Sequence, residues 1–124
     1  MTSYIVFDFE TTGLNPYHDN IIEYTFLGNS QHITSLIYPK KTLDDKIIKI
    51  TGITNEMVSN KPAIENKSNE IFEFIKHIFN TKHKVGPYIY LIAHNNDGFD
   101  KFFFKRMFKD NSEQREFIHK HVRF

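Results

Sequence analysis

The chain has 124 residues, a formal net charge of +1, and 40% hydrophobic against 25% charged residues, which fits one folded domain and excludes a disordered or multidomain chain. Cysteine is absent, which excludes disulfide frameworks, thiolate zinc sites and cysteine nucleophiles. The N-terminal segment lacks the basic region of a targeting peptide and no apolar run reaches the ~18 residues of a membrane span, so we expect a soluble, intracellular protein.

Three strands are predicted in the first third of the chain. Residues 4–10 are aromatic and β-branched and end at a Thr-Thr-Gly turn. Residues 21–28 and 31–38 have a similar composition, and Pro39 closes the second of these segments. The short turn Gly28-Asn29-Ser30 between them predicts an antiparallel hairpin.

Helices are predicted in the middle of the chain. Residues 44–50 and 55–59 are expected to form two short helices, the second of them capped by Thr54 or Asn55. Apolar residues at three- and four-residue spacing predict a longer amphipathic helix over 65–80.

The rest of the chain alternates strand and helix. Residues 88–93 form a near-continuous apolar run, which is typical of a central buried strand. A helix is expected over 97–109, and the polar tail 112–124 is expected to be partly helical. The order β-β-β-α-β-α predicts one α/β domain over residues 1–124, built on a mixed sheet.

Two carboxylates lie near the end of the first predicted strand. Asp8 and Glu10 are two residues apart, so strand alternation directs both to the same face of the sheet. They repel each other unless a cation lies between them or one of them takes up a proton. Considered alone, the pair is more simply explained as the acidic end of a strand that runs into solvent. The surrounding sequence must decide between this explanation and a functional pair of acids.

The residues around this pair make the pattern specific. Residues 7–14 read Phe-Asp-Phe-Glu-Thr-Thr-Gly-Leu, so a turn with hydroxyls and free backbone N–H groups directly follows the two acids. Such groups are suited to holding a phosphate end near a cation. The segment resembles the first motif of the DEDD 3′–5′ exonuclease superfamily, in particular the DEDDh branch that contains the proofreading subunit of bacterial DNA polymerase III.

Three further segments resemble the same family in the same order. They are Ile21-Ile22-Glu23, the Gly-Ile-Thr helix pair within 49–58, and residues 93–100, Ala-His-Asn-Asn-Asp-Gly-Phe-Asp. The last segment resembles the second exonuclease motif with one inserted residue. The resemblance spans about residues 4–108 and implies a ribonuclease H-like α/β fold.

The resemblance implies a metal-dependent nuclease. Asp8, Glu10 and Asp100 would be its catalytic carboxylates and would bind two divalent cations, Mg²⁺ or Mn²⁺, which prefer oxygen ligands. Two such ions can activate a water and stabilise the leaving 3′ oxygen. The implied reaction is the removal of 3′-terminal nucleotides from DNA or RNA, and the implied partner is a single-stranded 3′ end.

Four further residues are assigned to the substrate side by the resemblance. Thr11 would contact the terminal nucleotide, and Leu14 would wedge against its base. A core position explains Leu14 equally well. Asn95 would support the second motif, and Phe99 would pack beneath the site.

The inserted residue leaves two candidates for the third carboxylate. Asp100 is preferred, because Phe99-Asp100 followed by Lys-Phe-Phe fits the family pattern, and Asp97 is then interpreted as a helix cap. Considered alone, Asp100 is explained as a helix-start acid favoured by the macrodipole. Glu23 is interpreted as structural, and the run 102–104 of three phenylalanines as core packing.

The third motif of the family, a histidine followed about five residues later by an aspartate, has no counterpart. The histidines after Asp100 are His119 and His121; no aspartate follows either, and both are interpreted as solvent-facing. The remaining candidates for a general base lie in segments that do not fit that role: His18, His32, His77 and His83. The chain thus resembles the first two thirds of the family domain, and we expect a C-terminally incomplete fold.

Two functions follow from these residues. The first is a 3′–5′ exonuclease that is inactive or very slow as this short chain, since general base catalysis is worth about 10²–10⁴ in rate. The alternative is a non-catalytic module that binds nucleic acid or another protein. The helix over 97–109 is expected to expose apolar surface, so the chain should self-associate or recruit a second chain that supplies the missing segment.

Overall fold

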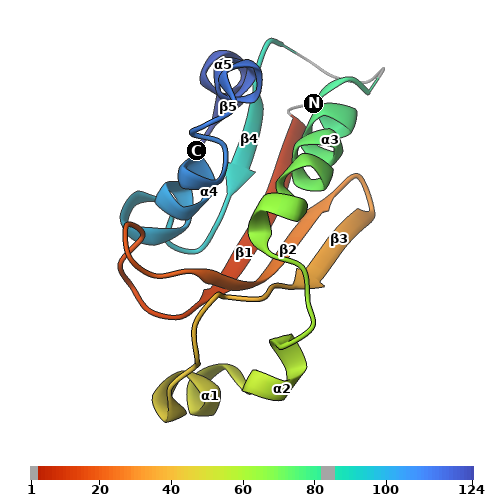
Figure 1. Cartoon of the computed structure of the whole chain (residues 1–124). Helices are drawn as coiled ribbons and strands as arrows, with labels where there is room; N and C mark the ends of the chain where they lie inside the picture. Colours follow the sequence, from red (N-terminus) through yellow and green to blue (C-terminus); the bar gives the residue numbers. More distant parts are fainter. Residues whose placement is uncertain (1–2, 82–85) are drawn as a thin grey trace.

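The computed structural model describes residues 3–81 and 86–124 and contains a five-stranded mixed sheet (Figure 1). The strand order is β3-β2-β1-β4-β5. The strands are β1 (Ser3–Thr11), β2 (Ile21–Gly28), β3 (Gln31–Leu36), β4 (Ile89–Ile92) and β5 (Val122–Arg123). β1, β2 and β3 pair antiparallel, whereas β4 runs parallel to β1, and β5 runs parallel to β4. The predicted mixed α/β sheet is confirmed.

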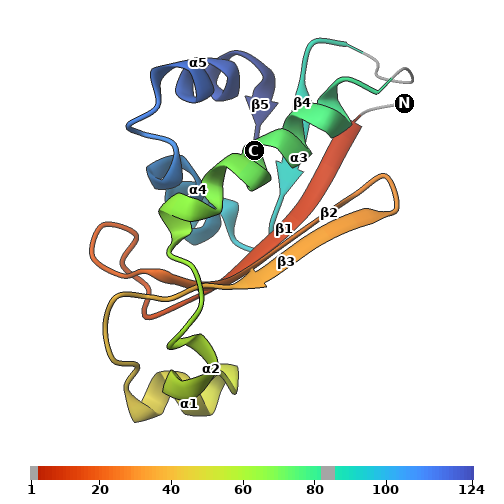
Figure 2. The same ribbon diagram turned by 45° about the vertical axis from the view of Figure 1, so that its right-hand side comes forward.

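Helices cover one face of this sheet and one end of it. They are α1 (Asp45–Thr51), α2 (Asn55–Val58), the 3₁₀ turn η1 (Ile64–Asn66), α3 (Ser68–Phe79), the π turn η2 (Asn96–Asp100), α4 (Lys101–Met107) and α5 (Ser112–His121). Figure 2 shows α3, α4 and α5 on the same side of the sheet, with α1 and α2 beyond the lower end of the strands. No helix within residues 3–81 and 86–124 is long and apolar enough to cross a bilayer.

Local sequence chemistry explains several element boundaries. Asn29 and Ser30 both have positive φ, at 51° and 61°, which is the backbone of a two-residue hairpin turn that matches strand twist. Thr54 caps α2, because its hydroxyl accepts the backbone N–H of Met57. Gly52 ends α1 in the left-handed conformation, at φ 75°.

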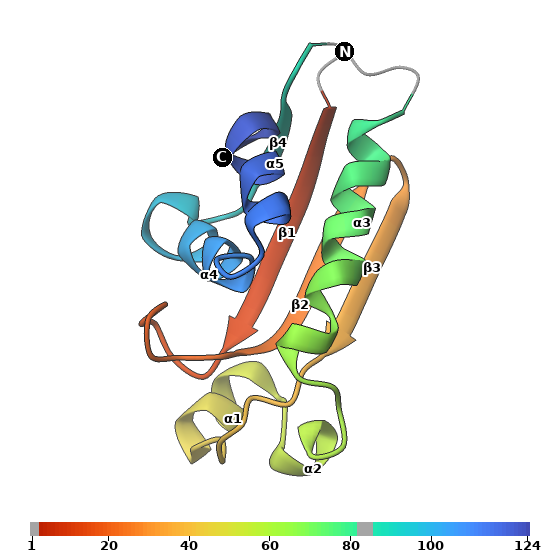
Figure 3. The same ribbon diagram turned by 45° about the horizontal axis from the view of Figure 1, so that its top comes forward.

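The main core lies between the sheet and α3, α4 and α5. The rings of Phe7 and Phe26 stack at 5.4 Å across β1 and β2, and Phe104 of α4 lies 5.9 Å from Phe7. Figure 3 shows α3 running along the sheet beside these strands. A smaller cluster holds α1 and α2 to the end of the sheet through Ile22, Leu43, Ile53 and Val58.

Two sequence predictions about the hydrophobic surface are wrong. The helix over 97–109 was expected to expose apolar surface, but Phe103 and Phe104 are buried because α4 packs directly on β1 and β2, and the interpretation of these two residues as core packing is confirmed. The segment 88–93 was expected to be buried on both faces, but Tyr90 and Ile92 of β4 are exposed. The exposed apolar surface belongs to the second face of the sheet.

We call this second face the open sheet face and define it by five side chains. They are exposed by between 39% and 56%: Tyr4, Val6, Leu27, Tyr90 and Ile92. They lie on three adjacent strands in register, since Val6 pairs with both Leu27 of β2 and Ile92 of β4. A continuous apolar patch of this kind is a site of association in soluble proteins.

We therefore expect the open sheet face, and not α4, to bind a hydrophobic dye and to mediate self-association. Val6→Thr combined with Leu27→Thr should lower dye fluorescence and the sedimentation-derived association constant, while stability changes by less than about 1 kcal/mol because threonine suits strands. Phe102→Thr is the matched control on α4. Dye binding and self-association that are lost in Phe102→Thr but retained in the Val6→Thr, Leu27→Thr double variant would contradict the assignment of association to the open sheet face.

Candidate active site

β1 presents two acids at the edge of the open sheet face. The neighbouring Phe7 and Phe9 point into the core, so alternation turns Asp8 and Glu10 to the opposite face. Asp8 is exposed and Glu10 is half-buried. Glu23 of β2 is the direct cross-strand partner of Glu10 and adds a third carboxylate to this end of the strand.

A β-bulge ends the regular pairing beside these acids. Glu10 pairs with Glu23, but the next residue, Thr11, pairs with Ile21, so β2 has one extra residue here. Bulges often lie next to active sites, where they redirect side chains. Thr11 continues the alternation of Phe7 and Phe9 and is buried, and its hydroxyl donates to the Gly13 carbonyl at 2.6 Å. The predicted contact of Thr11 with a nucleotide stays a prediction.

The π turn η2 brings Asp100 to the sheet. The carbonyl of Asn95 accepts the N–H groups of both Phe99, at 3.0 Å, and Asp100, at 3.1 Å. A π turn holds one residue more than an α-helical turn, which is the geometry that the predicted one-residue insertion in the second motif would need. Asp100 then lies at the start of α4 with only 2% of its surface exposed.

Asp97 is placed differently from the sequence interpretation. Its side chain is fully exposed and forms an ion pair with Lys101 at 3.8 Å. Asn95, not Asp97, stands at the N-cap position of η2, and its side chain makes no capping hydrogen bond. The interpretation of Asp97 as a helix cap is therefore wrong, because the turn begins before Asp97, at Asn96.

The acids at this end of β1 influence one another electrostatically. Burial raises the pKa of Glu10, and the negative charges of Asp8 and Glu23 raise it further. Burial also raises the pKa of Asp100, and the charge of Asp8 adds to the effect, whereas hydrogen bonding to the backbone at Asn95 and Phe9 opposes it. Asp8 is thus the common neighbour of Glu10 and Asp100.

Two observations favour a cation among these carboxylates. Their mutual repulsion is relieved by positive charge, and the buried Oδ1 of Asp100 finds no hydrogen-bond partner among the described residues. Carboxylate oxygens are the ligands that Mg²⁺ and Mn²⁺ prefer. Within residues 3–81 and 86–124, no three His, Asp or Glu side chains are already gathered into a metal-holding group. The convergence of Asp8, Glu10 and Asp100 to a metal-bridging distance stays a prediction.

The remaining predicted site residues flank the acids in sequence. Leu14 is 83% exposed, so the alternative that it is a core residue is wrong. Asn95 is exposed and supports the second motif through its carbonyl. Phe99 is half-buried, with its ring 4.9 Å from that of Phe103, which anchors η2 on the core.

Sequence reasoning missed the place of Glu23. It was interpreted as structural, yet it faces Glu10 across the strand pair and raises the pKa of that residue. The signal was present in β2: Tyr24 and Phe26 are core residues, so strand alternation assigns Glu23 to the open sheet face.

The histidines lie outside this group of acids as far as the described residues show. His119 is solvent-exposed as predicted, but the prediction is wrong for His121, whose ring packs 4.5 Å from Phe79 and whose Nδ1 lies 2.9 Å from the Pro87 carbonyl oxygen. The other histidines considered as bases are exposed or outside the described residues: His18, His32 and His77 are exposed, and His83 is outside. No described histidine contributes to the pKa shifts of Glu10 or Asp100.

The raised pKa values predict an unusual pH dependence for the metal-free protein. Between the ordinary carboxyl pKa near 4 and the raised values, the folded chain binds more protons than the unfolded chain. The free energy of unfolding should therefore increase as the pH falls from about 7.5 to 5. Below about 4 the trend should reverse, since the lowered pKa values of Asp19 and Glu65 make these acids stabilising only when ionised.

Urea denaturation in EDTA at pH 7.5 and pH 5 measures this effect. The double variant Glu10→Gln, Asp100→Asn should show a smaller gain on acidification than the unsubstituted chain, because all other titrating groups are shared. An equal gain in both proteins would contradict the assignment of the pH dependence to these two carboxyls.

Comparison with known proteins places the fold and the site in context. A model of a family described as exonuclease, of the RNase T type, matches residues 5–122. The chain is 33% identical over 118 residues to the PolC-type DNA polymerase III of Mycoplasmopsis pulmonis, covering 91% of this chain and 7% of that protein. It is 34% identical over 99 residues to DNA polymerase III subunit epsilon of Buchnera aphidicola, covering 66% of this chain and 40% of that protein.

Solved structures share the same architecture. Apo exonuclease I superposes with a TM-score of 0.73 at 18% identity, covering 100% of this chain and 29% of that one. A zinc-bound complex of E. coli exonuclease I with single-stranded DNA gives a TM-score of 0.68 at 18% identity, covering 90% of this chain and 24% of that one. The predicted ribonuclease H-like fold is confirmed, and the chain spans less than half the length of each of these proteins.

Proposed function

Because the chain belongs to the RNase T-type exonuclease family of the DEDD superfamily, we propose that it binds the 3′ end of single-stranded DNA and hydrolyses the terminal phosphodiester bond. The observation that carries this proposal is the group of acids at the end of β1. Asp100 is buried there, its Oδ1 has no hydrogen-bond partner among the described residues, and the charge of Asp8 raises its pKa; Asp8 itself is exposed and Glu10 is half-buried.

The carboxylates have a defined role in this proposal. Asp8, Glu10 and Asp100 hold two divalent cations, Mg²⁺ or Mn²⁺, which when bound supply Lewis-acid activation of water and neutralise charge on the phosphate. Burial and the charge of Asp8 raise the pKa of both Glu10 and Asp100, so protons compete with a cation for these two carboxylates more strongly than for ordinary ones. Metal affinity should therefore increase with pH.

The loop after β1 supplies contacts to the DNA end. Leu14 offers an exposed apolar side chain that can cover the face of a terminal base. Stacking or apolar contact of this kind does not depend on base identity, which suits an enzyme that removes any nucleotide. Glu23 keeps the site strongly negative, so DNA phosphate approaches it only when cations are present.

DNA is proposed as the substrate because of the relatives. The sequence relatives are named as DNA polymerase III proteins, and a structural relative was solved with single-stranded DNA. Likeness of name alone does not distinguish DNA from RNA at this site, so a competition assay between a DNA and an RNA 3′ end of the same sequence belongs to the test.

A second candidate function is a non-catalytic 3′-end binding module. The observation that favours it is that no described histidine acts on Glu10 or Asp100. General base catalysis contributes about 10²–10⁴ in rate, so a site that lacks a base would bind DNA and hydrolyse it slowly. The two candidates differ in rate and agree on where the DNA end binds.

A 5′-labelled single-stranded oligonucleotide separates these functions. With Mg²⁺ or Mn²⁺ the exonuclease should produce a ladder that shortens from the 3′ end, and Asp8→Asn should abolish it. Asp97→Asn is the matched control, since Asp97 is exposed and lies in the same motif. Tight 3′-end binding in Ca²⁺ without a ladder in Mg²⁺ would support the binding module. Equal affinity for linear and circular DNA would contradict both.

A further inference from the structure

The loop between β1 and β2, residues 12–20, is closed on itself by hydrogen bonds. The Asp19 carboxylate accepts the Thr12 hydroxyl at 3.0 Å and the backbone N–H of Asn15 at 2.9 Å. The Thr12 hydroxyl oxygen in turn accepts the N–H of Asn20 at 2.9 Å. These bonds to the charged form lower the pKa of Asp19 although partial burial opposes them, so the acid is ionised at neutral pH.

Gly13 lies inside this closed loop. A Cβ atom at Gly13 would come within 2.4–2.7 Å of the Asp19 carboxylate, which is closer than atoms can approach. The carboxylate is held by several hydrogen bonds and cannot readily give way. The close packing of the loop on the Asp19 carboxylate therefore requires glycine at position 13, and the next residue, Leu14, is exposed to solvent.

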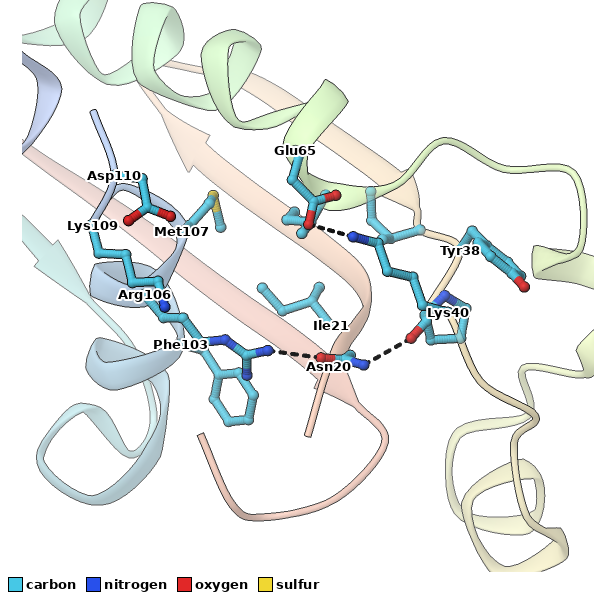
Figure 4. Close-up of a pocket in the computed structure, with 13 residues that line it drawn as sticks. Asn20, Ile21, Tyr38, Lys40, Glu65, Phe103, Arg106, Met107, Lys109 and Asp110 are labelled. Atoms are coloured by element: carbon cyan, nitrogen blue, oxygen red, sulfur yellow. Dashed lines mark hydrogen bonds and ion pairs between the residues drawn. The ribbon is translucent and has the colours of Figure 1, made fainter. Parts of the chain in front are cut away.

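The side chain of Arg106, on α4, binds this loop through hydrogen bonds. Its Nη1 donates to the carbonyl oxygens of Pro16, at 2.9 Å, and Asp19. Its Nη2 donates to Oδ1 of Asn20 at 2.9 Å, the contact that Figure 4 shows. One guanidinium thus binds three acceptors on the far end of the loop. The figures show the loop extending beneath α4, which agrees with these contacts.

Asn20 links the β1–β2 loop to the segment that follows β3. Its Nδ2 donates to the Pro39 carbonyl at 2.8 Å, and Lys41 Nζ lies 3.3 Å from Oδ1 of Asp19. A cavity of about 330 Å³ separates Arg106 and Asn20 from the Lys40–Glu65 ion pair (Figure 4). The Arg106 side chain therefore connects α4 to the β1–β2 loop, and this connection lies beside the cavity.

From these contacts we infer that Arg106 is a positioning residue, which fixes the β1–β2 loop so that Leu14 meets the terminal base of a bound 3′ end. This inference rests on the proposed function. Arg106 lies on α4 six residues after Asp100, which is the last residue of η2 directly before that helix, so the continuous segment of η2 and α4 positions both the third carboxylate and the loop. A loop held in its binding conformation loses less conformational entropy when DNA binds.

A lysine cannot replace this arginine. The planar guanidinium directs several N–H groups in fixed directions, whereas an ammonium group is a single flexible donor centre. Arg106→Lys keeps the charge and the approximate length but cannot hold three acceptors in the same geometry. The positioning role therefore predicts that Arg106→Lys and Arg106→Gln have similar defects, whereas a role of charge alone predicts that lysine restores function.

Hydrogen exchange and DNA binding together test this role. In both Arg106 variants we expect the exchange of amides in residues 12–20 to accelerate at least roughly tenfold, and the preference for linear over circular single-stranded DNA in Ca²⁺ to fall several-fold. Amides of β1 and β2 should keep their protection, which shows that the fold is intact. Arg115→Gln is the matched control, because Arg115 is an exposed arginine that donates to a backbone carbonyl, of Lys109, outside the loop.

Every outcome of these two measurements either supports or overturns the positioning role of Arg106. Unchanged exchange in residues 12–20, or faster exchange without any loss of the preference for linear DNA, would overturn the positioning role. Restoration by lysine would overturn it in favour of charge alone. If the unsubstituted chain itself shows no preference for linear over circular DNA, the proposed function fails, and the positioning role fails with it. That result is visible before any variant is made.

Discussion

Replacing Asp100 by asparagine is expected to slow metal-dependent hydrolysis by roughly two to three orders of magnitude and to stabilise the metal-free fold at neutral pH. Loss of one cation ligand removes part of the several kcal/mol that bound metals contribute to the transition state, which corresponds to roughly 10²–10³ in rate. Stability changes in the opposite direction because burial and the charge of Asp8 raise the pKa of Asp100, so its ionised form is unfavourable in the folded state.

The sign of the stability change distinguishes a functional acid from a structural one. A carboxylate that stabilised the fold through hydrogen bonds would have a lowered pKa, and its replacement would destabilise the protein. Urea midpoints at pH 7.5 in EDTA and steady-state rates in Mg²⁺ measure the two effects. Asp97→Asn, which removes an exposed acid paired with Lys101, should change neither by much. A less stable Asp100→Asn variant with retained activity would contradict the account of the site.

Replacing Phe104 by alanine should cost about 3–5 kcal/mol of folding free energy, the usual range for a buried phenylalanine. Its side chain is completely buried and its ring contacts those of Phe7, Phe26, Phe108 and Phe124, at 5.0–6.3 Å between centroids. These contacts join α4 to β1, β2 and the C-terminal strand, so the resulting cavity would lie where the helix layer meets the sheet. Such a loss removes a large part of the stability of a domain of this size.

Phe102→Ala is the matched comparison for this prediction. Phe102 lies on the same helix, two residues before Phe104 in the same run of phenylalanines, but it is 37% exposed. Its replacement should cost less than about 1 kcal/mol. Thermal or urea denaturation of both variants gives the difference directly. Similar losses in the two variants would mean that α4 is packed on more than one side.

The sequence predicted the sheet better than it predicted what covers it. Residues 4–10 and the Asn29-Ser30 turn have strong local signals, and both were confirmed. The helix over 65–80 divides into η1 and α3 around Lys67, which apolar spacing alone does not reveal. β5 was missed because two residues, Val122 and Arg123, carry no periodicity, and only pairing with β4 defines the strand.

Long-range contacts account for the other differences. The three phenylalanines at 102–104 gave no indication of which side would be buried, and that was decided by packing against Phe7 and Phe26. The same holds for His121, which lies against Phe79, a residue more than forty positions earlier in the chain. Arg106 carried no sequence signal at all, since its three acceptors lie in a loop about ninety residues away.

The candidate acids could be predicted from sequence because their signal is local. Strand alternation places Asp8 and Glu10 on one face, and the π turn leaves Asp100 buried and Asp97 in solvent. The sequence analysis interpreted Glu23 as structural and did not pair it with Glu10. The pairing could not be predicted because a β-bulge shifts the register between β1 and β2, and no local sequence pattern indicates that bulge.

Calorimetric titration with Mn²⁺ tests the central claim most directly. The unsubstituted chain should bind Mn²⁺ with a dissociation constant in the millimolar range or tighter, and it should release more protons on binding at pH 5 than at pH 7.5, because the raised pKa values of Glu10 and Asp100 leave more of these carboxyls protonated at the lower pH. Asp8→Asn, Glu10→Gln and Asp100→Asn should each remove the binding heat, while Asp97→Asn should retain it. Equal heats from all five proteins would show that Asp8, Glu10 and Asp100 are not a metal site.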